Sequence, residues 1–419
     1  MAWYVQQTPG DAWDYTATQP MIFADMAIDG QVRKVLMQAP KNGLFYVIER
    51  ATGKLLSAKP FVPINWLKSL DLKTGRAEIE KSRADYSRET RLIFPSGQGG
   101  HSWNPMSYDA GRGVVYIPAI EIGEYVLQPT ERLLYRQHAR NMGRYTAFSE
   151  PPPAVIQRLP PKMREAIQAG KLRDGQPDTR MRAVLRAFEP LTGKTQWEHE
   201  SAGGAWDRGG VLSTDGGLVF QGTGTGRLRA YDADNGQVLL DLDIGTAIMA
   251  APMTFIANGE QFIAVLAGWG GAGWYNQAPN NAASVYGNAG RILAFRLGGG
   301  RTPKPNPLPP LPPIPQPPEL KADATELSHG SHLFGAYCMF CHSDSERTGS
   351  ANLTRMSPAV HATFENIVLK GARLPLGMPR FDDALSTEDA RAIHQFLISK
   401  AWDAYRAKTP ASSTNTVAH

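Results

Sequence analysis

The stretch LRAYDADNGQVLLDL, residues 228–242, has the form of a β-hairpin. An apolar run leads into acidic residues, a turn that ends in glycine follows, and a second apolar run comes after it. Asn-Gly between two alternating apolar runs is a strong signal for a tight hairpin turn. The same pattern returns as FYVIERATGKLL (45–56), LRAFEPLTGKTQWE (185–198) and, in a weaker form, SLDLKTGRAE (69–78).

Further short apolar runs lie between these hairpins, namely GVVYIPA (113–119), GLVFQGT (217–223) and FIAVLAG (262–268). Many short strands with one repeated hairpin favour sheets arranged radially, as the blades of a β-propeller. We therefore predict a mainly β fold with about four to five blades. The alternative is a β-sandwich in which the repetition is accidental.

Residues 124–180 interrupt this pattern, since they are charged, contain several prolines and include the helix-like stretch PPKMREAIQAGKL (160–172). We interpret them as a long insertion between blades that runs over the surface. A lid over a functional site is the other interpretation.

A proline-rich segment, RTPKPNPLPPLPPIPQPPEL (301–320), divides the chain. Such a density of proline favours an extended, semi-rigid spacer. The spacing of apolar residues is helical after it, and Ser386 and Asp389 suit the start of the last helix as a capping box. We predict a propeller part over 1–300, a linker over 301–320, a small all-α domain over 321–405 and a disordered tail over 406–419.

The small domain contains CMFCH, residues 338–342, which holds the chain's only two cysteines. Cys-x-x-Cys-His is the spacing for covalent haem attachment, with Cys338 and Cys341 bonded to the porphyrin and His342 below the iron. A zinc site would need two more ligands. A lone disulfide between the two cysteines is the structural alternative.

A sixth ligand for the iron is predicted in ARLPLGMPRFDDALS (372–386). Met378 stands between Gly377 and Pro379 in a loop before the last helix, and a thioether ligand there would raise the reduction potential. The domain also contains four histidines that compete for this role: His329, His332, His361 and His394.

Composition excludes some classes of function. The 419 residues carry a formal net charge of +5 without a run of Lys and Arg, which argues against nucleic-acid binding. We find no apolar stretch of the ~18 residues that a membrane span needs, and the N-terminus lacks the pattern of an export signal.

Several stretches together resemble the quinohaemoprotein alcohol dehydrogenases, enzymes that use pyrroloquinoline quinone (PQQ). These are TPGDAWDYTATQPM (8–21), APKNGLFYVIERATGKLLSAKPFVPINW (39–66), GGHSWNPMSYDAGRGVVYIPA (99–119), GGVLSTDGGLVFQGTGTGRLRAYDADNG (209–236) and APMTF…FIAVLAGWGG (251–271). The order of proline-rich linker, CxxCH domain and GMP loop is similar as well.

The resemblance implies an eight-bladed propeller with PQQ on its axis, a Ca²⁺ ion beside the quinone, and oxidation of an alcohol to an aldehyde with electrons passed to haem c. It implies that Asp14 is the general base and lies near the Ca²⁺, and that Lys41 bonds to the quinone oxygens. It places two pairs beside PQQ, Trp103 with Asn104 and Trp269 with Gly270. Ser102 departs from the family, which has an amide there.

The resemblance covers only the C-terminal part of such an enzyme, so we expect a truncated chain in which Met1 is an internal start and which does not oxidise alcohols alone. Half a ring would leave two blade faces unpaired. The alternative function is a non-catalytic electron-transfer cytochrome on an incomplete propeller scaffold. For the intact family we expect a periplasmic location and, as acceptor, a copper protein, another cytochrome or a membrane quinol system.

Overall fold

The computed structural model describes residues 1–129, 135–139, 141–177, 180–268, 281–339, 341–342 and 351–408. By their contacts the residues form two compact units. The first comprises Met1–Glu131 and Gly143–Pro307, and the second Arg132–Met142 and Leu308–His419. Within the described residues we find no helix with the length and apolar character that crossing a membrane requires.

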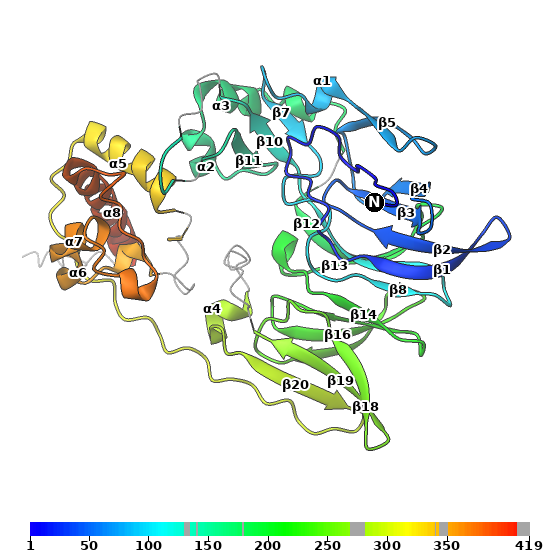
Figure 1. The fold of residues 1–419 in the computed structure, drawn as a ribbon. Helices are drawn as coiled ribbons and strands as arrows, with labels where there is room; N and C mark the ends of the chain where they lie inside the picture. Colours follow the sequence, from blue (N-terminus) through cyan, green and yellow to red (C-terminus); the bar gives the residue numbers. More distant parts are fainter. Residues whose placement is uncertain are drawn as a thin grey trace, which may run out of the picture. The chain divides into compact units, whose positions relative to one another are not determined.

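Antiparallel sheets that follow one another make up the first unit (Figure 1). The first sheet contains β1 (Ile22–Ile28), β2 (Gln31–Gln38), β3 (Leu44–Glu49) and β4 (Leu55–Pro60). The second, in the order β13-β12-β9-β8, contains β8 (Ser107–Asp109), β9 (Val114–Glu121), β12 (Arg182–Phe188) and β13 (Thr195–Glu200). The third contains β14 (Val211–Ser213), β15 (Leu218–Gly222), β16 (Arg227–Asp232) and β17 (Val238–Asp243), and the fourth β18 (Met253–Ala257), β19 (Glu260–Ala267) and β20 (Arg291–Arg296).

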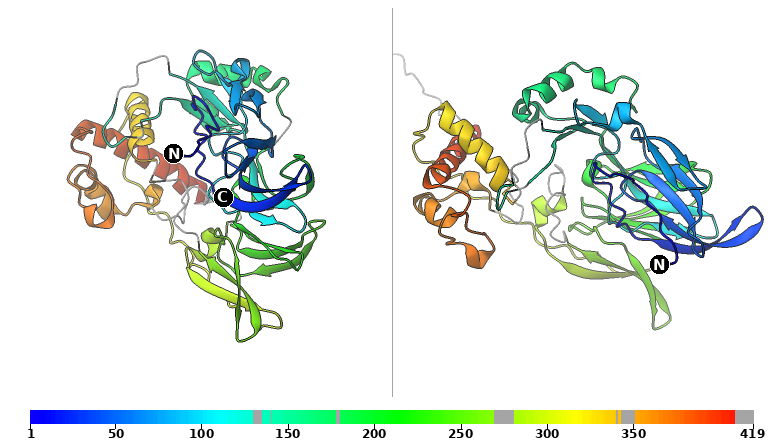
Figure 2. Two further views of the ribbon diagram at one scale, coloured as in Figure 1. Left: turned by 45° about the vertical axis from the view of Figure 1, so that its right-hand side comes forward. Right: turned by 45° about the horizontal axis from the view of Figure 1, so that its top comes forward.

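Smaller elements complete this unit. A hairpin joins β5 (Leu67–Asp71) to β6 (Arg76–Ile79), and a three-stranded sheet contains β7 (Arg91–Ile93), β10 (Glu124–Leu127) and β11 (Tyr145–Phe148). The short helices are α1 (Lys81–Ala84), α2 (Pro153–Arg158), α3 (Pro161–Gln168), η1 (Lys171–Arg173), η2 (Gly204–Trp206) and α4 (Ala282–Tyr286). The views in Figures 1 and 2 agree on the succession of the four main sheets, and the predicted mainly β, propeller-type architecture is confirmed.

The repeated sequence pattern forms one repeated turn. In β3–β4 the Thr52 hydroxyl donates to the Glu49 carboxylate, and Gly53 takes a left-handed φ of 75°. The turn after β12 repeats this with Thr192 and Glu189. The four expected hairpins are thus present because a carboxylate, a hydroxyl or amide, and a glycine close the turn locally.

Tryptophan side chains connect these turns to neighbouring segments. The Trp197 ring lies on Gly236, the turn glycine of the next sheet, so closely that a Cβ there would be 2.6 Å from the ring. Its indole Nε1 donates to the Ala233 carbonyl at 2.9 Å. Trp3 packs on Gly53 in the same way and donates to the Arg50 carbonyl. A glycine is required because any side chain would displace the indole ring.

The fourth sheet has one covered face and one bare face. Val265, Leu293 and Phe295 pack against the third sheet. The opposite side, here called the outer face, carries Met253, Phe255, Phe262, Leu266 and Ile292. The exposed fractions of Met253, Leu266 and Ile292 are 61%, 58% and 78%. A contiguous apolar face of this kind is typical of a surface that another element covers.

We expected an exposed, unpaired face on the first sheet as well as on the last one, and the first sheet differs from this expectation. Leu36, Tyr46 and Ile48 on its free side pack in one cluster with Trp13 and others. Only the edge of that side, with Phe23 and Val32, is exposed. Because the N-terminal segment covers this sheet together with side chains such as Trp66, Ile93 and Val126, the prediction of two unpaired faces is wrong for one of them.

The second unit is helical and contains α5 (Ala324–Tyr337), η4 (Leu353–Arg355), α6 (Pro358–Ala362), α7 (Phe364–Val368), η5 (Leu374–Leu376) and α8 (Thr387–Lys408). The capping box is confirmed, since the Ser386 hydroxyl accepts from the Asp389 N–H and the Asp389 carboxylate from the Ser386 N–H, both at 3.1 Å. The helix α8 continues to Lys408, three residues into the predicted disordered tail, whose remainder lies outside the described residues.

The proline-rich segment is in contact with folded structure along much of its length. In the first unit Arg291 donates to the Pro303 carbonyl at 2.6 Å, and Lys304 pairs with Asp243. In the second unit Trp402 donates to the Pro318 carbonyl at 2.8 Å, and Ile314 is 8% exposed. The segment therefore belongs to the first unit up to Pro307 and to the second unit from Leu308.

Candidate functional site

Asp14 and Lys41 form an ion pair in the first unit, with 3.1 Å between Lys41 Nζ and Asp14 Oδ2. The Asp11 carboxylate accepts the N–H groups of Trp13 and Tyr15, which bends the chain around Asp14. Asp14 itself has a left-handed φ of 70°. Its side chain remains 56% exposed, so this carboxylate is accessible to a small molecule.

Backbone contacts hold Lys41 in place. The Gly100 N–H donates to the Lys41 carbonyl at 2.9 Å. Gly99, with a φ of 82°, lies so close that a Cβ on it would be 2.4 Å from the Lys41 side chain. The Lys41 side chain is 17% exposed, so its ammonium group is oriented rather than free in solvent.

Two further charged residues lie around this pair, and sequence reasoning missed both. Glu124 is 8% exposed and accepts the Gly97 N–H at 3.2 Å. Burial raises the pKa of its carboxyl, and the charge of Asp14 contributes in the same direction. Arg144 lies 3.9 Å from Glu124 and donates to the Ala12 carbonyl.

Glu124 and Arg144 were missed because both lie within residues 124–180, the predicted insertion. Residues 124–180 were interpreted as a surface excursion, but β10 begins at Glu124 and all four of its residues are buried. The short continuous apolar run Tyr125-Val126-Leu127 in EIGEYVLQ (121–128) is the signal that could have revealed this buried strand.

The predicted PQQ contacts Trp103 and Asn104 lie in different environments. Trp103 is 46% exposed. Asn104 is fully buried and donates from Nδ2 to the carbonyls of Arg208 and Met249, at 3.1 and 3.3 Å. Its Oδ1 has no hydrogen-bond partner among the described residues. The predicted contacts Trp269 and Gly270 lie outside the described residues.

His101 connects the loop of Lys41 to the loop of Asn104. Its ring nitrogens lie 2.7 Å from the carbonyl oxygens of Ala39 and Asn104. The side chain is fully buried, and this burial lowers the pKa of His101 to about 4, although the two carbonyl groups favour the protonated ring.

The lowered pKa of His101 predicts a pH-dependent stability. An unfolded histidine binds a proton near pH 6.5, whereas the folded one resists it until about pH 4. The unfolding free energy of the first unit should therefore fall by about 3 kcal/mol between these pH values. Urea unfolding of the wild type and of His101→Gln over this range measures the effect, and parallel profiles for the two proteins would contradict it.

The haem motif begins where α5 ends. Cys338 is half-buried, Cys341 is exposed, and the N–H groups of Cys341 and His342 both donate to the Cys338 carbonyl. Burial raises the pKa of the Cys338 thiol to about 12. Nδ1 of His342 lies 3.0 Å from the Ala351 carbonyl, which leaves Nε2 as the nitrogen for a metal.

Met378 lies on the same apolar cluster as Cys338. Both side chains are partly exposed against a core that includes Phe381, Leu385 and Ile393. Gly377, with a φ of 87°, ends η5 and turns the chain into this position. The arrangement fits haem, because Cys338 and Met378 pack on one apolar cluster and Cys341 and His342 follow Cys338 in the next turn of the chain.

Each competing histidine has another neighbour. His329 lies 2.8 Å from Asp389, and His361 lies 2.8 Å from His394. His332 lies 3.4 Å from Arg136. The sixth ligand therefore remains a prediction for Met378.

The described residues fit a calcium ion poorly. They contain no group of three or more His, Cys, Asp or Glu side chains that could hold a metal ion. Ca²⁺ takes six to eight oxygen ligands, so Asp14 could supply only a small part of such a site.

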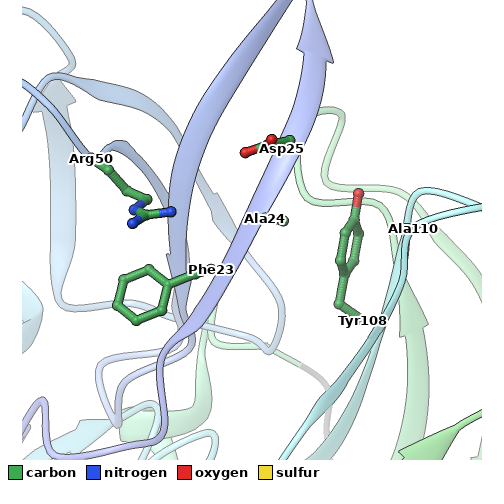
Figure 3. Close-up of a pocket in the computed structure, with 6 residues that line it drawn as sticks. All are labelled: Phe23, Ala24, Asp25, Arg50, Tyr108 and Ala110. Atoms are coloured by element: carbon green, nitrogen blue, oxygen red, sulfur yellow. The ribbon is translucent and has the colours of Figure 1, made fainter.

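A shallow hollow lies beside β1, between Arg50, which is stacked over Phe23, and Tyr108. Figure 3 shows these side chains with Ala24, Asp25 and Ala110. None of the predicted site residues lines it.

Two family models match the chain. One is "Glucose/ethanol/alcohol dehydrogenase, beta-propeller domain", over residues 1–66 and 199–263. The other is "Cytochrome C oxidase, cbb3-type, subunit III", over residues 325–397.

Individual proteins are similar over nearly the whole chain. Quinohemoprotein alcohol dehydrogenase ADH IIB of Pseudomonas putida is 36% identical over 98% of the chain and 56% of its own length. ADH-IIG of the same species is 39% identical over 96% of the chain and 54% of its own length. The chain is similar to the quinohaemoprotein alcohol dehydrogenases over nearly its whole length. It spans about half the length of the curated relatives that it matches.

A solved structure agrees with this similarity. That of ADHIIG from Pseudomonas putida HK5 has a TM-score of 0.79 and 37% identity, over 96% of the chain and 56% of the solved one. The resemblance to the quinohaemoprotein alcohol dehydrogenases is thus confirmed, and it supports PQQ and haem c as the family's cofactors.

Proposed function

We propose that the chain is the C-terminal part of an enzyme that oxidises an alcohol to an aldehyde and passes the electrons to haem c. The observation that carries this proposal is the Asp14–Lys41 pair, an exposed carboxylate 3.1 Å from an oriented ammonium group. Bound PQQ would supply the two-electron acceptor for this reaction, and bound haem a one-electron carrier.

The residues of the first unit have distinct roles in the proposal. Asp14 accepts the hydroxyl proton of the alcohol, since the oxygen must lose it as the carbonyl forms. Lys41 orients this carboxylate through their ion pair, and it offers positive charge to a cofactor oxygen nearby. The α C–H bond of the alcohol breaks as the carbonyl forms, and its hydrogen and electron pair would pass to bound PQQ, so that two electrons and two protons leave in total.

In the second unit, Cys338 and Cys341 bond to haem, His342 ligates the iron through Nε2, and Met378 completes the coordination. Ca²⁺ belongs to the proposal as an ion near Asp14 whose other ligands come from outside the described residues. The protein would act in the periplasm. Its electron acceptor would be a copper protein, another cytochrome or a membrane quinol system.

The exposed apolar outer face of β18–β20 suggests that another sheet packs against it in the assembled enzyme. Its apolar side chains continue the sheet-on-sheet packing that joins the third sheet to the fourth. We infer that further propeller sheets would cover this face and complete the site around Asp14.

The chain alone is therefore expected to show no alcohol oxidation. The test supplies PQQ, Ca²⁺, ethanol and an artificial acceptor to the haem-loaded chain. The same assay on an intact relative, such as ADH IIB, serves as the positive control. Turnover by the chain well above the rate without PQQ would refute the expectation that the site is incomplete.

A second candidate function is that of a non-catalytic electron-transfer module. The separate compact unit with its own haem residues favours it. The two functions differ when the chain is combined with only that part of a relative which the chain does not match, because only a chain that contributes Asp14 to an enzyme would then reduce its haem upon addition of alcohol.

A further inference from the structure

A short segment of the predicted insertion belongs to the cytochrome unit. Residues 132–142 cluster with the second unit, although their neighbours on both sides, up to Glu131 and from Gly143, belong to the first. The chain therefore passes from the first unit to the second and back within about a dozen residues, well before the proline-rich segment passes to it again.

A side chain within the segment holds it in a defined turn. Asn141 Oδ1 accepts the Arg136 N–H at 2.8 Å, and its Nδ2 donates to the carbonyls of Arg136 and Ala139 at 2.8 and 2.9 Å. His138 has a left-handed φ of 57°. These contacts define the clamp turn, residues 136–141, of which Arg140 lies outside the described residues.

The clamp turn contacts the loop that follows Met378. Gln137 Nε2 donates to Asp383 Oδ2 at 2.6 Å, and His138 Nε2 lies 2.9 Å from the same oxygen. The His138 ring also stands edge-on to the Phe381 ring, with 5.9 Å between centroids. The clamp turn therefore grips two residues of one loop through both polar and aromatic contacts.

Phe381 contacts the clamp turn and also lies next to both segments that carry the proposed iron ligands, His342 and Met378. It follows Met378 by three residues, is 6% exposed, and its N–H donates to the Val368 carbonyl. Its ring stands edge-on to Tyr337, which directly precedes Cys338. A displacement of Phe381 would thus alter the positions of both Cys338 and Met378.

We propose that the clamp turn positions the Met378 loop and so keeps the methionine sulfur on the haem iron. The inference rests on the proposed function only through Met378 as axial ligand. Gln137 and His138 are positioning residues, since they act through Phe381 and Asp383 and do not touch the iron. The clamp turn lies between two parts of the chain that belong to the first unit, so ligation of the haem iron depends on a segment outside the C-terminal domain sequence.

The test uses the full-length, haem-loaded chain and imidazole, which competes with methionine for ferric iron. In the double variant Gln137→Ala/His138→Ala, the affinity for imidazole should rise about tenfold, because the methionine-bound state becomes less populated. Asn141→Ala should act in the same direction, since it dissolves the turn without removing a contact to the loop. The matched control is Tyr135→Ala, whose side chain is 79% exposed and which should behave as wild type.

Two further readouts separate positioning from a general loss of structure. The methionine–iron charge-transfer band and the haem midpoint potential should both fall in the clamp variants, while the far-UV circular dichroism stays unchanged. Wild-type imidazole affinity in both clamp variants would overturn the proposal. If Met378→Ala itself leaves the band and the affinity unchanged, the assignment of the axial ligand fails instead, and the role of the clamp turn fails with it.

Discussion

The double substitution Cys338→Ser/Cys341→Ser is expected to abolish covalent haem binding. The chain has two cysteines, so no other thiol can form a thioether bond to the porphyrin. The matured protein should lose its Soret absorbance after denaturation and gel filtration, and its band should not stain for haem on a denaturing gel. This loss is complete rather than partial, which makes it the largest effect that we predict.

Single variants provide the controls for this experiment. Cys341→Ser retains the half-buried thiol of Cys338, so one thioether can still form and some haem should remain attached. His342→Ala should retain covalent haem but alter its visible spectrum, since the imidazole Nε2 is lost. Haem that survives denaturation in the double variant would mean that the motif does not attach it.

Asp14→Asn should have the second-largest effect, measured on the chain assembled with the part of a relative that the chain does not match. Alcohol turnover should fall by about 10²- to 10⁴-fold, the usual contribution of a general base. Asparagine is the suitable replacement because it tolerates the left-handed φ of 70° at this position. Loss of one exposed ion pair with Lys41 should cost at most about 1 kcal/mol of stability.

The matched control for Asp14 is Asp215→Asn, an exposed carboxylate in the turn before β15. Its turnover should equal that of the wild-type assembly, and haem content should be equal in all three proteins. If Asp14→Asn retains wild-type turnover, then another group removes the proton. Glu124 would be the first candidate, since it is buried close to the same charges.

Local sequence patterns were sufficient for much of the fold. The hairpin turns depend on residues within four positions of one another, as in Glu49 and Thr52, and the capping box depends on Ser386 and Asp389. The apolar face of α8 is equally local: Ala390, Ile393 and Leu397 are 1%, 0% and 3% exposed. Contacts of this kind can be predicted from the sequence because their residues are only a few positions apart.

Contacts between distant segments could not be predicted in this way. Arg144 reaches the Ala12 carbonyl, and His101 joins the backbone at Ala39 to that at Asn104, without any signal in the sequence around them. The clamp turn was missed for the same reason, since charged residues next to prolines suit a solvated loop equally well. The resemblance to a family, rather than spacing, implied that Asp14 and Lys41 act at one cofactor site, and the structure places them in an ion pair.

The indole–glycine contacts have a consequence for how the first unit loses its structure. Trp197 joins one sheet to the next, and each sheet in the middle of the series packs against two others. Stability in such an array is approximately a sum of nearest-neighbour terms, as in a one-dimensional chain of coupled units. Among the described residues the fourth sheet packs against one other sheet, so we expect melting of this unit to begin at the fourth sheet and to proceed inward.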